Sequence, residues 1–253
     1  MICANATELH VAMMADIADV KLLRTVSDPT SPACSQMVEA EPFRSYVLRS
    51  PVHNLVTCDT RWAIANVLHF FAATEHAGIL RRYNKHADRF LTGDRLVGAY
   101  GLIAVPQIRR CIELLKEDKY SRRAIVSMGA LSELTVNSPP CWTSLHFVES
   151  HGKLHMGVEQ RSLSMSVMPY DCVLLCNILD FVGCSLGVVP GTVHWRIGNL
   201  HRKPEHTVQY GPRNLGILFR NDLLREPWLC EQVLSHPETW DNPYAKELLR
   251  DPS

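Results

Sequence analysis

The sequence predicts one α/β domain in which helices pack on a sheet, and three observations support this fold class. Two segments of helical length, 61–74 and 171–186, are apolar almost all round, as expected of helices buried on most sides. Segments with strand patterns, such as 143–149 and 154–161, lie between them. At 253 residues the chain can bury a sizeable core, and neither a repeat nor a linker divides it, so we expect residues 1–253 to form one domain.

The N-terminal third combines a short helix, a loop and strands leading to the first apolar helix. Residues 1–22 carry apolar side chains at helical spacing, continuing to Leu23. Segment 27–41 is rich in Pro, Ser, Ala and Cys, which is typical of a loop, and Ser45–Leu48 and Asn54–Thr57 are predicted strands.

Polar residues interrupt the apolar helix predicted at 61–74. Asn66 and His69 fall within it, and polar side chains in a buried helix need hydrogen-bond partners. A satisfied hydrogen bond in the core is the simplest interpretation of each, and we favour it for His69.

The middle of the chain predicts a helix, a strand and a hairpin. Pro106 suits the first turn of a helix that continues through an apolar stripe to Leu115. Segment 123–128 is a predicted strand. Ser150-His151-Gly152-Lys153 separates two strand patterns and indicates a hairpin turn.

The second apolar helix, 171–186, is expected to end at Gly187. Pro190-Gly191 then predicts a turn into a strand over 192–197. Further on, 229–234 and 245–249 show short helical patterns broken by prolines.

Composition narrows the class of protein. Lys and Arg total 26, as do Asp and Glu, so no net field attracts a polynucleotide or an acidic membrane. The nine cysteines are odd in number and form no CxxC pair. Cys172 and Cys176 lie four residues apart on an apolar helix, and no histidine is spaced to complete a zinc site with these two. The start of the chain lacks the pattern of a signal peptide, and no stretch reaches the ~18 apolar residues of a membrane helix. We therefore expect a reduced, cytoplasmic protein that binds neither polynucleotide nor membrane.

Three short pieces suggest an active site. Cys141 follows Pro139-Pro140, whose fixed φ angles restrict the backbone that directs the thiol. Arg161 and Ser162 stand together at the end of a predicted strand, where they can bind phosphate. Asp171 places a carboxylate at the start of an apolar helix. A thiol, an anion-binding pair and a carboxylate are the components of a catalytic site.

An ordered set of motifs resembles the thymidylate synthase superfamily, which includes the pyrimidine nucleotide hydroxymethylases. The matching motifs are Gly98-Ala99-Tyr100-Gly101, Ser121-Arg122-Arg123-Ala124, Pro140-Cys141, Gln160-Arg161-Ser162, Pro169-Tyr170-Asp171 and Gly198-Asn199-Leu200-His201. The resemblance covers roughly residues 51 to 206 and implies a large twisted mixed sheet covered by helices. It also implies a homodimer with back-to-back sheets and shared active sites, with variable segments at 1–44 and 207–253.

The resemblance also implies roles for single residues. Cys141 matches the cysteine that adds to C6 of the pyrimidine, and Tyr100 matches a tyrosine that helps to polarise the water network on the pyrimidine side. His201 matches a histidine that contacts the sugar hydroxyl. The matches to the phosphate site are Arg122, Arg123, Arg161 and Ser162, of which the paired arginines reach into the neighbouring subunit.

Several positions depart from the family pattern on the nucleotide side. Asp171 replaces an asparagine, and an ionised carboxylate only accepts hydrogen bonds, which favours the 4-amino group of cytosine. A helix N-cap is the alternative interpretation of Asp171, and both can hold. Lys203 replaces a tyrosine and alters the sugar contact. Segment 31–41 lacks the usual phosphate-binding arginine, for which Arg44 or Arg49 could substitute.

Other departures fall on the folate and proton-transfer side. Asn66 takes the place of a glutamate that relays protons, and an amide cannot act as a general acid or base. Ser164 replaces an aspartate that binds the pterin of the folate. Trp142 follows the cysteine where histidine is common, and we place Ser164 and Trp142 at the cofactor.

We weigh three functions. The first is a transferase that uses 5,10-methylenetetrahydrofolate to hydroxymethylate C5 of CMP or dCMP, as in nucleoside-antibiotic pathways. The second is a folate-independent enzyme that also begins with thiol addition at C6. The third is an inactive nucleotide-binding homologue, against which the retained Cys141 argues.

Overall fold

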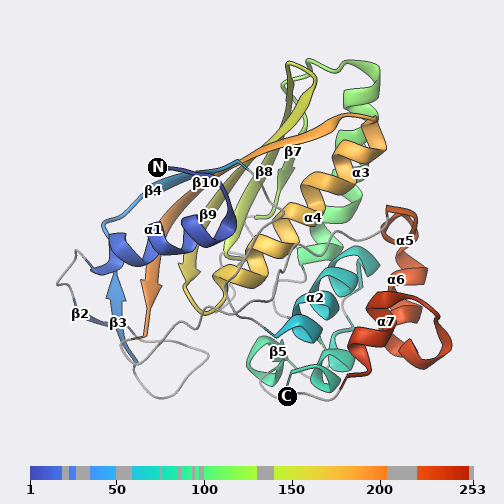
Figure 1. Ribbon diagram of the computed structural model, residues 1–253, viewed down its shortest axis with the longest axis horizontal. Coiled ribbons are helices and arrows are strands. Elements are labelled where there is room, and N and C mark those ends of the chain that lie inside the picture. The colour runs from blue at the N-terminus through green and yellow to red at the C-terminus, as the bar shows by residue number, and fades with distance from the viewer. Residues whose placement is uncertain are drawn as a thin grey trace.

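The computed structural model describes residues 1–18, 23–26, 35–49, 59–74, 76–84, 87–92, 95–96, 100–129, 140–203 and 221–250. These residues form the expected α/β fold, a large mixed sheet with helices packed against it (Figure 1). The strands are β1 (Ile2–Cys3), β2 (Leu23–Val26), β3 (Ser35–Glu39), β4 (Arg44–Leu48), β5 (Leu91–Thr92), β6 (Arg95–Leu96), β7 (Ile125–Ser127), β8 (Trp142–Ser150), β9 (Lys153–Ser164) and β10 (Val189–Arg202). The helices are α1 (Ala6–Ala18), α2 (Thr60–Ala72), α3 (Tyr100–Glu117), α4 (Met168–Leu186), α5 (Asn221–Arg225), α6 (Pro227–Ser235) and α7 (Pro243–Leu248), with 3₁₀ turns at Gly78–Arg82, Ala87–Phe90 and Pro237–Thr239.

The main sheet runs in the order β1-β4-β10-β9-β8-β7, with β3 also paired to β10 and β2 to β3. The β1/β4 and β9/β10 pairs are parallel and the others antiparallel, so the sheet is mixed. One row of paired, buried residues crosses five strands and shows the face on which the core lies: Val126, Leu145, Val158, Trp195 and Tyr46. Because strand side chains alternate, the next row points to the opposite face.

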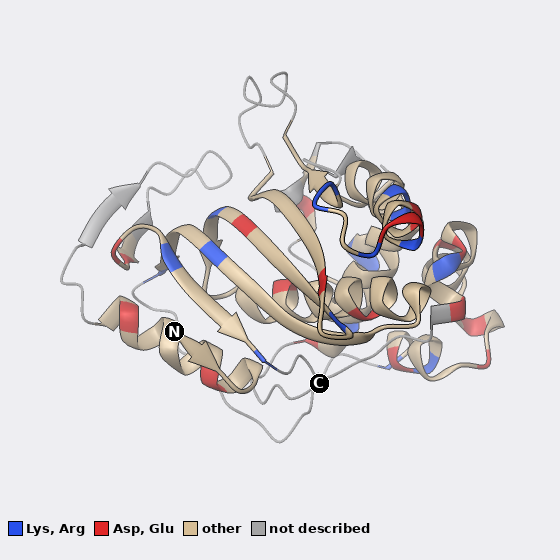
Figure 2. Cartoon of the chain, turned by 90° about the horizontal axis from the view of Figure 1, so that it is seen from above, with Lys and Arg blue, Asp and Glu red and all other residues tan. Residues whose placement is uncertain are grey.

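Helices cover the core face of the sheet. α4 packs against β9 and β10 and touches α1, α2 and α3, and α1 and α4 lie on the same side of the sheet (Figure 1). The helices α5, α6 and α7 pack around α2. Basic and acidic residues are intermixed over the strands and helices (Figure 2), in keeping with the zero net charge.

Helix α4 passes the length and composition test for a membrane span, with a mean hydropathy of 1.3. The expectation that no segment is apolar enough is therefore wrong for Met168–Leu186. Most of that helix is buried inside the protein, between the sheet and α2, which is the situation of a core helix.

Most predicted elements are confirmed where the structure describes them. The hairpin of β8 and β9 turns at His151 and Gly152, whose φ angles of 51° and 73° are those of a type I′ turn. α4 ends at Gly187 in the left-handed conformation, as predicted. The predicted strand at 54–57 and the proposed loop at 27–34 lie outside the described residues.

Four local predictions are wrong. Leu23 begins strand β2 instead of continuing a helix, and Ser35–Glu39 forms strand β3 instead of a loop. Both segments are strands because β2 pairs with β3, and β3 also pairs with β10. Pro106 lies inside α3, which begins six residues earlier at Tyr100. Pro190-Gly191 lies within β10, where the register with β9 shifts, instead of forming a turn before it.

Gly101 allows α3 to approach α2 closely. A Cβ atom at this position would lie 2.0 Å from the carbonyl oxygen of Phe70, which is backbone and cannot rotate away. We expect Gly101→Ala to lower the free energy of unfolding by about 3 kcal/mol, measured by urea denaturation. Gly129→Ala, where the added Cβ meets nothing within 4 Å, is the matched control and should change it little. Equal stability of the two variants would contradict this packing.

Candidate active site

Cys141 lies just before β8, and residues from α3 and β9 hold its backbone in place. The backbone N–H of Cys141 donates to the hydroxyl of Tyr100, the first residue of α3, at 2.7 Å. The Cys141 carbonyl accepts the backbone N–H of Arg161 at 2.8 Å, and Arg161 Nε donates to the carbonyl of Pro140 at 3.1 Å. Tyr100 and Arg161 thus fix the backbone on both sides of the thiol.

The carboxylate of Asp171 lies in the first turn of α4 and faces the same place. Its Oδ2 accepts from the side-chain amide of Gln160 at 3.1 Å and from the indole N–H of Trp142 at 3.4 Å. The indole of Trp142 stacks on the ring of Tyr100, with centroids 5.4 Å apart and planes inclined by 13°. The thiol and the carboxylate are therefore linked through one aromatic pair.

The predicted alternative that Asp171 is the N-cap of this helix is wrong. α4 begins at Met168, and its N-cap is Val167, which makes no side-chain capping bond. Pro169 occupies one of the first two helical positions, as prolines commonly do. The side chain of Asp171 is therefore left for Gln160, Trp142 and whatever binds beside them.

Gln160 joins this site to the centre of the sheet. It is 97% buried, its Nε2 also donates to the carbonyl of Ser162 at 2.9 Å, and its Oε1 accepts the indole N–H of Trp195 at 2.9 Å. The sequence motifs indicate no role for the side chains of Gln160 and Trp195. Gln160 follows Leu154, Met156 and Val158 on the core face of β9, and a polar residue at the next such position is a signal that could have identified it.

Burial sets the proton affinities of the site. It raises the pKa of Asp171 from 3.8 to about 6, against the two hydrogen bonds that lower it. Burial also raises the pKa of the Cys141 thiol, and the negative charge of Asp171 adds to this rise. The Arg161 guanidinium and a hydrogen bond with Tyr100 both lower the pKa of the thiol and so oppose the rise. The pKa of Tyr100 lies well above its ordinary value, chiefly through burial, so this hydroxyl keeps its proton. The thiol is thus protonated at rest and needs activation when substrate binds.

The ends of β9 and β10 bring further predicted residues together. Ser162 pairs with Asn199 and Ser164 with His201 in the parallel register. His201 Nδ1 and Asn199 Oδ1 are 2.9 Å apart, and the hydroxyl of Ser164 bonds to that of Ser166 at 3.0 Å. These residues are only partly buried, as a ligand-binding edge requires.

Two other predicted residues lie close to this region. Lys203 follows β10, two residues beyond His201, and is partly exposed. Asn66 lies one turn before Phe70 on α2, and Phe70 packs on Trp142 at a centroid distance of 6.4 Å. The amide of Asn66 donates to the carbonyl of Trp62 in its own helix at 2.8 Å, so it is satisfied locally.

Arg122 and Arg123 are not brought to Cys141 within one chain. Both are exposed in the turn before β7, and the neighbouring Ala124 carbonyl accepts the N–H of Phe147. Phe147 is six residues beyond Cys141 along β8, a span of roughly 20 Å. These arginines are therefore too far from the Cys141 thiol of their own chain to act at the same site.

The burial of Trp142 argues against its expected place at a cofactor. Only 1% of this residue is exposed, between Tyr100 and Phe70, so its ring offers no face to a bound folate. Its one polar atom is directed to Asp171 instead.

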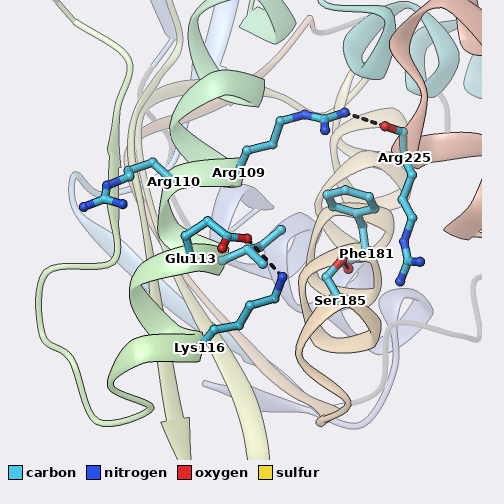
Figure 3. Close-up of a pocket in the computed structure, with 8 residues that line it drawn as sticks. Arg109, Arg110, Glu113, Lys116, Phe181, Ser185 and Arg225 are labelled. Atoms are coloured by element: carbon cyan, nitrogen blue, oxygen red, sulfur yellow. Dashed lines mark hydrogen bonds and ion pairs between the residues drawn. The ribbon is translucent and has the colours of Figure 1, made fainter.

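A separate pocket of about 550 Å³ lies at the other end of α3 and α4 (Figure 3). Two of its four basic side chains are engaged, since Arg109 donates to the backbone carbonyl of Arg225 at 2.6 Å and Lys116 pairs with Glu113 at 3.0 Å. Figure 3 shows Arg110 directed away from Phe181. None of the predicted site residues lines this pocket, so the candidate site is the region around Cys141 and Asp171.

Asp171 should make stability depend on pH. Its folded pKa of about 6 exceeds the ordinary 3.8, so its contribution to stability is fully present below about pH 4 and is lost as the pH rises through about 6. The difference of about 2 pKa units corresponds to at most about 3 kcal/mol. We expect Asp171→Asn to be more stable than the wild type at pH 7 but equal to it near pH 4, in urea unfolding without ligand. A difference independent of pH would contradict the assignment.

Two comparisons with known proteins concern the family and the fold of this chain. The model of the family described as thymidylate synthase matches residues 47–211, well over half of the chain. The crystal structure of thymidylate synthase from T4 phage is similar in fold, with a TM-score of 0.61 and 20% identity over 77% of this chain and 76% of that chain.

Proposed function

Because this chain belongs to the thymidylate synthase family, we propose that it is a transferase acting at C5 of a cytidine nucleotide, CMP or dCMP, and leaving a 5-hydroxymethyl group. The observation that carries the choice of base is the arrangement around Asp171. Both protein donors reach its Oδ2, and its Oδ1 accepts from no other described residue. An ionised Oδ1 suits the 4-amino group of cytosine and repels the O4 carbonyl of uracil.

The remaining residues of the site fit the binding of a nucleotide monophosphate. Arg161 and Ser162 would bind the phosphate and His201 the sugar hydroxyl, with Lys203 close to it. Burial raises the pKa of Cys141, and the Arg161 guanidinium opposes that rise, so the positive charge proposed to hold the phosphate also favours the thiolate.

The chemistry begins with addition of the Cys141 thiolate to C6, which makes C5 nucleophilic. C5 would then form a bond to the one-carbon unit and lose its proton, and the bond from that unit to the nitrogen of its carrier would break, which leaves an exocyclic methylene and a free carrier amine. Water would add to this methylene, and elimination of the Cys141 thiolate restores the ring. Tyr100, which keeps its proton, holds the backbone of the cysteine and orders the polar groups beside the base.

5,10-Methylenetetrahydrofolate would supply the one-carbon unit when bound. Among the described residues, Ser164 offers a hydroxyl to its pterin, which replaces a hydrogen bond but not the charge of a carboxylate. The fit of this position to the pterin is therefore partial.

The second candidate, C6 addition without folate, is favoured by Asn66 and Ser164. The Asn66 amide is bonded within its own helix and cannot relay protons, and Ser164 lacks the negative charge that binds the pterin. This candidate keeps the role of Cys141 and the nucleotide contacts.

The deciding experiment incubates the protein with C5-tritiated CMP, dCMP and dUMP, with and without methylenetetrahydrofolate. Tritium release from a cytidylate that requires folate supports the hydroxymethyl transferase and identifies the sugar. Release without folate supports the second candidate. If no tritium is released but nucleotide binds, the chain is an inactive homologue, and both enzymatic proposals fail.

We also propose that the protein is a homodimer with shared active sites. The face of the sheet opposite the core carries a row formed by Ile125, His146, Gly157, His194 and Val47, which no described helix covers. His146 Nε2 on this face is buried without a hydrogen-bond partner among the described residues. A second sheet packed here would cover the row and offer His146 a partner.

Shared sites predict complementation between two inactive variants. Arg122→Ala/Arg123→Ala lacks the arginines donated to the other subunit, whereas Cys141→Ala lacks the thiol. After the two are mixed, unfolded and refolded together, each heterodimer keeps one intact site, so about a quarter of the wild-type activity should return. Activity that stays absent in a sample of dimeric mass would contradict sharing, and a monomeric mass in light scattering would contradict the dimer itself.

A further inference from the structure

Two indole groups fix the direction of every hydrogen bond around Asp171. An indole N–H can only donate. The Trp195 indole meets Oε1 of Gln160 at 2.9 Å, so that atom must be the acceptor oxygen, and Nε2 must face Asp171. The carbonyl of Ser162, which accepts from the same Nε2 at 2.9 Å, requires the same orientation.

The second indole, that of Trp142, determines which oxygen of Asp171 is left for a ligand. Trp142 reaches the same oxygen of Asp171 as Gln160, and it too can only donate. Oδ2 therefore faces two donors and has no room to carry a proton. Any proton that Asp171 binds must sit on Oδ1, the oxygen left for a ligand.

We propose that Trp142 and Trp195 are specificity-determining positioning residues, which act through the Asp171 carboxylate to restrict base recognition to the single atom Oδ1. Ionised Oδ1 accepts from the 4-amino group of cytosine, whereas protonated Oδ1 donates to O4 of uracil. The choice of base then follows the protonation of one atom. This inference rests on the proposed function, since it concerns the same site and the same nucleotides.

The ionisable groups around Asp171 do not titrate in the pH range in which Asp171 does. Cys141, just before β8, and Tyr100 from α3 face it, and burial raises the pKa of both, so neither ionises in the range where Asp171 does. Arg161 from β9 stands beside Cys141 and contributes a positive charge there. A change of base preference near pH 6 would therefore report Asp171.

The test measures binding of CMP and UMP by calorimetry at a series of pH values from about 5 to about 8, on either side of the Asp171 pKa of about 6. In the wild type the ratio of CMP to UMP affinity should rise at least about tenfold across this range. Asp171→Asn should show a ratio that does not change with pH. The deoxynucleotides dCMP and dUMP replace the pair if they bind more tightly.

Trp142→Phe keeps the stacked ring but removes one donor to Oδ2, which favours protonation of Asp171. We expect the midpoint of the change in preference to move upward by about 0.5 to 1 pH unit. Trp195→Phe removes one of the two contacts that orient the Gln160 amide and leaves only the Ser162 carbonyl, so we expect a smaller shift in the same direction. The control, Trp228→Phe on α6, changes a tryptophan that is 60% exposed and should leave the midpoint in place.

The outcomes separate this inference from the proposed function. If neither base binds at any pH, the proposed nucleotide function fails and the inference with it. If nucleotide binds with a pH-independent ratio in the wild type, or the midpoint stays the same in both Trp142→Phe and Trp195→Phe, only the inference is overturned. Because the wild type and Asp171→Asn suffice for the first comparison, a variant that fails to fold does not remove the test.

Discussion

Replacement of Cys141 by alanine is expected to reduce tritium release from C5 of the nucleotide by at least about a thousandfold, because the proposed bond to C6 is formed by this thiol. Tyr100 and Arg161 hold the backbone of Cys141 from both sides, so the variant should keep its fold and still bind nucleotide. The measurements are the release rate and the dissociation constant for CMP.

Cys184→Ala is the matched control, since Cys184 is an exposed thiol at the far end of α4. It should retain wild-type activity. Substantial release by Cys141→Ala would show that the reaction does not pass through this thiol, and a similar loss in Cys184→Ala would point to a nonspecific effect of removing thiols.

Asp171→Asn is expected to reverse the base preference from cytidylate to uridylate. The amide can donate from Nδ2 to O4 of uracil, while its oxygen still accepts from Gln160 and Trp142. A mispaired polar group in a buried site costs enough that the ratio of activities on the two bases should change by at least about a hundredfold. Competition between tritiated CMP and UMP, or their deoxy forms, measures this ratio directly.

Asp180→Asn removes the same charge from the same helix, more than two turns further along, and should not change the base preference. An unchanged preference in Asp171→Asn would mean that another residue reads the base. A loss of all binding would mean that the carboxylate is required for the site to form.

Most of the fold could be predicted from local patterns. The apolar helices, the hairpin at His151-Gly152 and the stop at Gly187 follow from periodicity and turn chemistry, which neighbouring residues determine. The wrong predictions fall at segments whose secondary structure depends on pairing with strands distant in sequence. Ser35–Glu39 becomes a strand because β2 and β10 pair with it, and Pro190-Gly191 stays in β10 because β9 continues beside it.

For the candidate site, too, one part follows from the sequence and another part from the tertiary structure. The sequence by itself determined the chemical groups, since the thiol, the arginines and the carboxylate stand in an ordered set of motifs whose family a model match then confirmed. Arg122 and Arg123 were expected to serve a neighbouring subunit, and their distance from the thiol along β8 agrees with that proposal.

Only the tertiary structure decided how those groups are held. Trp142 was expected at a cofactor but is buried against Tyr100, and Trp195 carried no signal, yet both indoles set the hydrogen bonds that reach Asp171. A sequence records which atoms can donate or accept, but not which of them meet. Here strand register and the packing of α4 on β9 make them meet, because folding buries these polar groups together and each must find a partner.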